Sequence, residues 1–117
     1  MRRTGARTPD DTVLQEIIGR IVALAEPERI ILFGSAARGE MGHDSDIDLL
    51  VVKEGDFDYG RLLGEIYRAL DGVDRAVDVV LVTAEDFHRY RDTHCLVIAP
   101  AVREGREVYH AQAVPAR

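Results

Sequence analysis

The sequence has a single cysteine, no tryptophan and no long hydrophobic run. Cys95 alone cannot form an internal disulfide, so we expect no disulfide framework, and a reducing compartment fits. No apolar stretch approaches the roughly 20 residues that a membrane-spanning helix needs. Residues 1–11 are basic at their start but lack the apolar segment of a secretory signal peptide. We therefore expect a cytoplasmic protein without membrane contact.

Positive charge is also in short supply. The chain carries 15 Lys and Arg against 21 Asp and Glu, which gives a formal net charge of −6 at pH 7. Three of the arginines lie in residues 1–8, where there is no acid, so the remainder has 12 basic against 21 acidic residues, a net charge of −9. Because nucleic-acid binding depends mainly on Lys and Arg contacts to phosphates, the acidic body argues against DNA or RNA as a partner.

The length of 117 residues suits one domain with one modest core. We expect this domain to cover residues 10–111, after a flexible N-terminal tail at 1–9 and before a frayed C-terminus at 112–117. Hydrophobic periodicity and turn residues predict strands over 29–33, 46–53, 76–82 and 106–110. They predict helices from about 10 to 24, 59–70, 84–91 and 94–104, and a short helical turn at 35–39 before a polar loop at 40–45.

Three helix signals are specific enough to test. Asp10 or Asp11 is expected to cap the first helix, and Asp58 the second. Thr83, followed three residues later by an acid, predicts the start of the third. Pro100 is expected to break or restart the last predicted helix, because proline lacks the backbone N–H of a helix interior.

The most informative stretch reads LFGSAARGEMGHDSDIDLLVV, residues 32–52. A buried strand ends in Gly34 and Ser35, and after ten residues Asp46 and Asp48 open a second strand. Side chains two apart on a strand share a face, so these carboxylates lie together while Ile47 points into the core. Two like charges about 4 Å apart repel by roughly 4 kcal/mol at an effective dielectric near 20. A cation is expected to offset this repulsion.

A third acid, Asp78, lies in the otherwise apolar strand 76–82, where an ionised carboxylate is costly without a partner. Three carboxylates suit an oxygen-ligand site for one or two Mg²⁺ ions, which also bind substrate phosphates. Gly34 allows close approach of the backbone to a phosphate, Ser35 begins a turn whose amides face it, and Arg38 is placed to meet the same group.

The site also predicts the topology. If the first strand ends at the site and the second begins there, they are antiparallel. Asp78 is near the start of the third strand, so the second and third strands are parallel and the helix 59–70 is their crossover. The expected fold class is α/β, a mixed sheet with flanking helices.

The pattern Gly-Ser-x10-Asp-x-Asp with a later strand Asp resembles the DNA polymerase β-type nucleotidyltransferase superfamily. The wording of residues 34–52 is similar to its minimal nucleotidyltransferase (MNT) branch, and the resemblance covers residues 12–110. It implies transfer of a nucleoside monophosphate from a nucleoside triphosphate. Asp46, Asp48 and Asp78 would then be catalytic and hold Mg²⁺, with two ions expected, and the nucleotide phosphates would lie at three residues: Gly34, Ser35 and Arg38.

A catalytic domain within 117 residues leaves little room for an acceptor pocket, so we expect no second domain and another protein to bring the acceptor. The MNT resemblance implies a HEPN toxin encoded as the pair of this chain, with ATP as donor and a toxin tyrosine as acceptor. Two alternatives stay open: a non-catalytic antitoxin that acts by binding, and transfer to a small-molecule hydroxyl at a subunit interface. The oligomeric state, homo- or hetero-oligomer, also stays open. A structural role stays open for Asp78 as a salt-bridged residue and for Arg38 as a surface residue.

Overall fold

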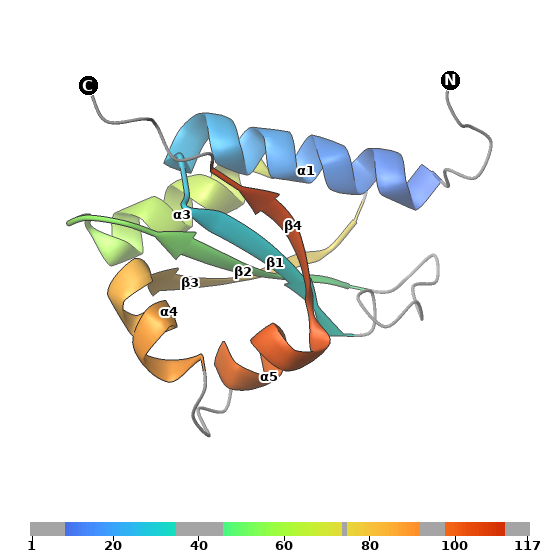
Figure 1. Ribbon diagram of the computed structural model, residues 1–117. Coiled ribbons are helices and arrows are strands. Elements are labelled where there is room, and N and C mark those ends of the chain that lie inside the picture. Colours follow the sequence, from blue (N-terminus) through green and yellow to red (C-terminus); the bar gives the residue numbers. More distant parts are fainter. Residues whose placement is uncertain (1–8, 35–45, 74, 92–97, 112–117) are drawn as a thin grey trace, which may run out of the picture.

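A computed structural model describes residues 9–34, 46–73, 75–91 and 98–111. Eight helices and strands have their bounds within these ranges (Figure 1). In chain order they are α1 (Pro9–Ala25), β1 (Arg29–Phe33), β2 (Ile47–Lys53), α3 (Tyr59–Ala69), β3 (Val77–Thr83), α4 (Ala84–Tyr90), α5 (Ile98–Glu104) and β4 (Arg106–His110). The predicted β1 and β4 agree with these bounds, and β2 and β3 each begin one residue later than predicted.

The strands form one sheet in the order β3-β2-β1-β4. β1 is antiparallel to β2 and to β4, whereas β2 and β3 are parallel. Parallel neighbours need a crossover, and α3 provides it between β2 and β3. The mixed α/β architecture and both predicted strand directions are therefore confirmed.

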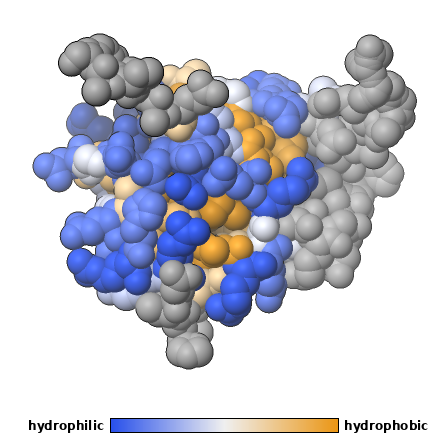
Figure 2. Space-filling model, viewed as in Figure 1, coloured by the Kyte–Doolittle hydropathy of each residue, from blue (hydrophilic) through white to orange (hydrophobic). Residues whose placement is uncertain are grey.

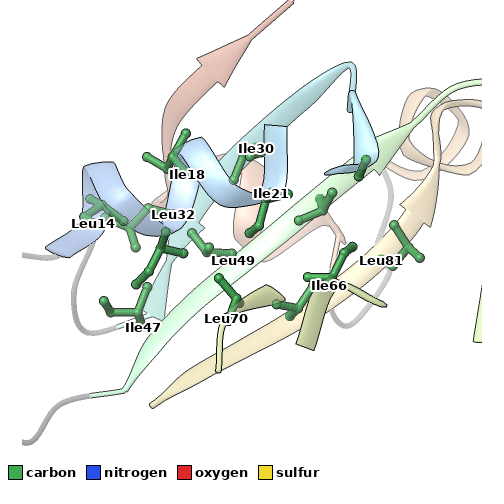
Figure 3. Close-up of a cluster of buried hydrophobic side chains, with 14 residues drawn as sticks. Leu14, Ile18, Ile21, Ile30, Leu32, Ile47, Leu49, Ile66, Leu70 and Leu81 are labelled. Carbon is green, nitrogen blue, oxygen red and sulfur yellow. The ribbon is translucent and has the colours of Figure 1, made fainter. Parts of the chain in front are cut away.

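Helices cover both faces of the sheet. α1 and α3 lie on one face and α4 and α5 on the other (Figure 1). The larger core lies under α1 and α3, where side chains from both helices meet alternate residues of β1, β2 and β3 (Figure 3). Its members include Leu14, Ile17, Ile21, Ile30, Leu32, Ile47, Leu49, Ile66, Leu70 and Leu81.

A second core lies between the sheet and the α4–α5 layer. Leu50 and Val52 of β2 point into it, and Phe87 and Ala101 close it from the helices. β2 is consequently buried on both faces, which explains its continuous apolar sequence. On the surface seen in Figure 2, apolar residues appear in a central band between hydrophilic residues.

The helix starts agree with two of the three capping predictions. The Asp58 carboxylate accepts a hydrogen bond from the Arg61 backbone N–H at 3.1 Å, and Thr83 Oγ1 accepts one from Asp86 N–H at 2.9 Å. The capping role predicted for Asp10 or Asp11 is wrong, because α1 already begins at Pro9. Proline is favoured at the first helical position, where its missing N–H costs nothing.

Pro100 does not break α5. It is the third residue of this helix, which begins at Ile98 and continues to Glu104. Backbone N–H groups in the first turn have no acceptor within the helix, so proline is tolerated there. The predicted segments 35–39, 40–45 and 94–97 lie outside the described residues, as do 1–8 and 112–117. No helix among the described residues is both long and apolar enough to span a membrane.

Candidate active site

Three strand ends bring the predicted site residues together. β1 ends at Phe33 and Gly34 follows it, while Asp46 directly precedes β2. The antiparallel register pairs Phe33 with Asp48. The parallel register pairs Asp48 with Asp78. The end of β1 and the starts of β2 and β3 therefore meet at one end of the sheet, and carry four of the six predicted site residues there.

The sheet pleat determines which face the carboxylates occupy. Ile47 and Leu49 are buried in the α1–α3 core, so the intervening Asp48 faces the α4–α5 side. Asp78 precedes Val79, which belongs to the same α1–α3 core, and therefore also faces the α4–α5 side. Asp48 is half-buried, whereas Asp46 and Asp78 are exposed. Asp48 and Asp78 are thus neighbours on adjacent strands and on the same face.

The charges of these acids affect one another. Burial raises the pKa of the Asp48 carboxyl, and the negative charges of Asp78 and Asp46, together with a hydrogen bond to Asp78, raise this pKa further. No Lys or Arg among the described residues forms an ion pair with Asp46, Asp48 or Asp78. The salt-bridged alternative for Asp78 therefore finds no partner in the described part of the chain. Within the part of the chain that the structure describes, the site therefore gathers negative charge without a paired Lys or Arg.

Gly34 lies directly against the central carboxylate. Its φ is +75°, in the left-handed region that favours glycine. A Cβ built on Gly34 would overlap Oδ2 of Asp48 and lie 3.2 Å from its Cγ. The sequence suggested Gly34 as a point of close approach to phosphate, and the contact with Asp48 gives a second reason for glycine that the sequence did not reveal.

The donor chemistry of the three acids fits Mg²⁺, which takes carboxylate oxygens and keeps several of its waters. Within the described ranges, however, no three His, Cys, Asp or Glu side chains are arranged closely enough to form a metal-holding group. The paired Asp48 and Asp78 come together, and Asp46 acts on Asp48 as a nearby charge. The three-carboxylate metal site stays a prediction. Ser35 and Arg38 lie outside the described residues, so their contacts with phosphate also stay predictions.

One residue near the site was missed in the sequence. Tyr67 of α3 accepts a hydrogen bond at its hydroxyl from the backbone N–H of Val79, at 2.8 Å. Val79 directly follows Asp78, so α3 is bonded to β3 beside a predicted metal ligand. A tyrosine at an exposed helix position gives no sequence signal for such a bond, because the bond depends on how the helix packs on the strand.

Comparison with known proteins identifies the family and the fold of this chain. Residues 14–107 match the family model of the nucleotidyltransferase domain. A proposed protein adenylyltransferase of Methanocaldococcus jannaschii is 59% identical over 32 residues, which are 27% of this chain and 32% of that protein. The matched stretch thus spans about a third of that relative's length.

Solved structures share the fold. A proposed nucleotidyltransferase from Sulfolobus solfataricus superposes with a TM-score of 0.58 at 22% identity, over 85% of this chain and 78% of that chain. A toxin–antitoxin complex with AMP-PNP superposes with a TM-score of 0.51 at 25% identity, over 84% of this chain and 74% of that chain. A mutant of the toxin–antitoxin pair MntA–HpeT superposes with a TM-score of 0.52 at 24% identity, over 84% of this chain and 73% of that chain. With a family match over most of its length and the site geometry of its strands, this chain belongs to the nucleotidyltransferase domain family.

Proposed function

We propose that this protein is the antitoxin of a toxin–antitoxin pair and transfers AMP from ATP to a tyrosine hydroxyl of a HEPN toxin. The observation that carries the chemistry is the register of β2 and β3, which sets Asp48 beside Asp78 while Gly34 packs against Asp48. Nucleotidyl transfer depends mainly on positioning and on stabilising phosphate charge, and a cluster of carboxylates at a glycine turn suits both tasks.

In the proposed reaction the tyrosine oxygen attacks the α-phosphorus of ATP. A new oxygen–phosphorus bond forms, the bond from the α-phosphorus to the bridging oxygen breaks, and pyrophosphate leaves. The exposed Asp78 accepts the tyrosine proton and passes it to water. Asp46 and Asp48, with Asp78, would hold Mg²⁺, which when bound supplies charge neutralisation for the phosphates. Gly34, Ser35 and Arg38 would bind the nucleotide phosphates.

Two similarities support the partner and the donor. The relative named for protein adenylylation shares 59% identity with a short stretch of this chain, and a protein with the same fold at 25% identity was solved as a toxin–antitoxin complex with AMP-PNP. The acidic composition also favours a protein acceptor over a nucleic acid. We infer a cytoplasmic location from the composition and from this partner class.

The test uses the whole chain with a candidate HEPN toxin. The two proteins are incubated with labelled ATP and Mg²⁺, and intact mass with peptide mapping then locates any added AMP. The double variant Asp46→Asn/Asp48→Asn is expected to keep the complex but lose transfer. Asp56→Asn/Asp58→Asn is the matched control, because it changes the same charge at the same spacing and asparagine still caps α3.

Each result discriminates between functions. The proposal is supported if the wild type and the control variant add AMP to a toxin tyrosine and protect cells, and the Asp46→Asn/Asp48→Asn variant does neither. Full protection by a folded Asp46→Asn/Asp48→Asn variant, without a mass increase on the toxin, would establish an antitoxin that acts by binding. Transfer to small hydroxyl compounds but never to the toxin would establish a small-molecule enzyme.

A further inference from the structure

β3 carries Asp78 at an edge of the sheet. In the described sheet β3 has one strand neighbour, β2, so its other edge presents backbone groups without a strand partner. The Val79 N–H on that edge donates to the Tyr67 hydroxyl at 2.8 Å, and the same hydroxyl lies 3.4 Å from the Val79 carbonyl oxygen. The shorter contact is a good hydrogen bond, whereas the longer one is too long to contribute much.

This bond lies where β3 needs a restraint. Asp48 of β2 and Asp78 of β3 lie side by side on neighbouring strands, and the negative charge of Asp78 is one reason for the raised pKa of Asp48. Repulsion between two neighbouring carboxylates favours separation of the strand starts. A backbone hydrogen bond of 2.9 Å from Ile47 N–H to the carbonyl of Ala76, the residue directly before β3, holds this strand start on its β2 side. The Tyr67 hydroxyl restrains it on the opposite side.

Packing alone does not account for a tyrosine at this position. The Tyr67 side chain is 42% exposed, while the adjacent Ile66 is fully buried and supplies the core contact of this turn of α3. A phenylalanine would keep the ring contacts of Tyr67. The hydroxyl is therefore the part of the side chain whose role is specific.

We propose that Tyr67 is a positioning residue, whose hydroxyl holds the Asp78 segment of β3 in place beside Asp48 through the Val79 backbone. The catalytic consequence rests on the proposed function of Asp78, whereas the restraint itself does not. Loss of the hydroxyl should let Asp78 move relative to Asp48. Gly34 lies beyond β2, at the end of β1, so nucleotide binding there should change less than the position of Asp78.

The test compares Tyr67→Phe with Tyr59→Phe in the full chain. Tyr59 is also an exposed tyrosine of α3, and its hydroxyl has no hydrogen bond to any described residue. By NMR, amide exchange at Val79 is expected to accelerate about five- to tenfold in Tyr67→Phe, as for loss of one hydrogen bond. Exchange at Leu50 in the central strand should stay unchanged, which separates local release from global unfolding.

The kinetic arm measures AMP transfer to the HEPN protein. In Tyr67→Phe, kcat should fall about tenfold or more, a larger change than that in KM for ATP, because misplacement of a reacting group slows the chemical step more than it weakens binding. Unchanged Val79 exchange overturns the restraint, and faster exchange with an unchanged kcat overturns the positioning role. If the wild type transfers no AMP, the proposed function fails separately. The Mg²⁺ affinity measured by calorimetry then replaces kcat as the readout. Weaker Mg²⁺ binding in Tyr67→Phe than in the wild type supports the positioning role, and equal binding overturns it.

Discussion

Gly34 and Asp48 lie so close that a β-carbon at residue 34 would occupy the space of the Asp48 carboxylate. The contact joins the end of β1 to the start of β2 at the point where Asp48 meets Asp78. A single glycine therefore gives the chain its turn and leaves room for the central acid of the proposed site.

Gly34→Ala should destabilise the fold and impair nucleotide binding together. The positive φ alone costs about 1–2 kcal/mol for a residue with a β-carbon, and displacement of the Asp48 carboxylate adds to this cost. Chemical denaturation and calorimetry with MgATP measure the two effects. The matched control is Gly55→Ala, because Gly55 has a φ of +83° but no atom within 4 Å of the added carbon. Gly55→Ala should lose stability but keep its affinity for MgATP. Equal affinities for MgATP in the two variants would contradict a nucleotide site at Gly34.

Asp48→Asn should stabilise the metal-free protein, by an amount that depends on pH. The folded-state pKa of Asp48 is raised above its unfolded value, first by burial and then by Asp78 and Asp46. The protonated carboxyl therefore favours folding below the unfolded pKa of about 3.9, and this contribution is lost as the pH rises through the folded pKa.

The advantage of Asp48→Asn should consequently be small in acid and larger at neutral pH. Because Asp48 is only half-buried, solvent screens the repulsion and the gain should stay below about 1 kcal/mol. Urea denaturation at several pH values in a chelating buffer measures it. Asp56→Asn, at an exposed turn position, is the control. If the increase in the free energy of unfolding caused by Asp48→Asn does not grow with pH, the carboxylates do not repel one another as described.

MgATP should raise the melting temperature of the wild type and leave that of Asp48→Asn unchanged. A ligand that binds only the native state stabilises it by about 2.7 kcal/mol at 100 times its Kd. Thermal denaturation with MgATP, with ATP plus chelator and with Mg²⁺ alone separates the contributions. Equal shifts for the wild type and Asp48→Asn would place the nucleotide away from these carboxylates.

Gly105→Ala should destabilise the fold by overpacking the contact between α5 and β1. A β-carbon on Gly105 would overlap the Ala101 carbonyl and lie 2.7 Å from Ile31 Cγ2 and 2.8 Å from the Leu32 carbonyl oxygen. Overpacking of this kind costs about 1–3 kcal/mol. Gly60→Ala, in α3 with no atom within 4 Å of the added carbon, should instead be neutral or stabilising. Chemical denaturation of the two variants is the measurement, and similar stabilities would contradict the tight contact.

Local sequence patterns determined most elements of this protein. The apolar runs at β1 and β2 and the capping residues Asp58 and Thr83 act through neighbours a few positions away, so their consequences can be read without the fold. The Asp46–Asp48 spacing likewise predicted a shared strand face, and the required meeting of strand ends predicted the mixed sheet. The predicted start of α1 was wrong because helix ends depend on several weak, competing preferences.

Tertiary structure alone decided the contacts between distant segments. The direct pairing of Asp48 with Asp78, the closeness of Gly34 to Asp48 and the bond from Tyr67 to Val79 depend on register and on helix placement. A one-residue slip would turn Asp78 to the other face of the sheet without changing any local propensity. The sequence by itself therefore determined which residues this protein offers for its chemistry, and the packing of α3 and three strands decided which of them meet.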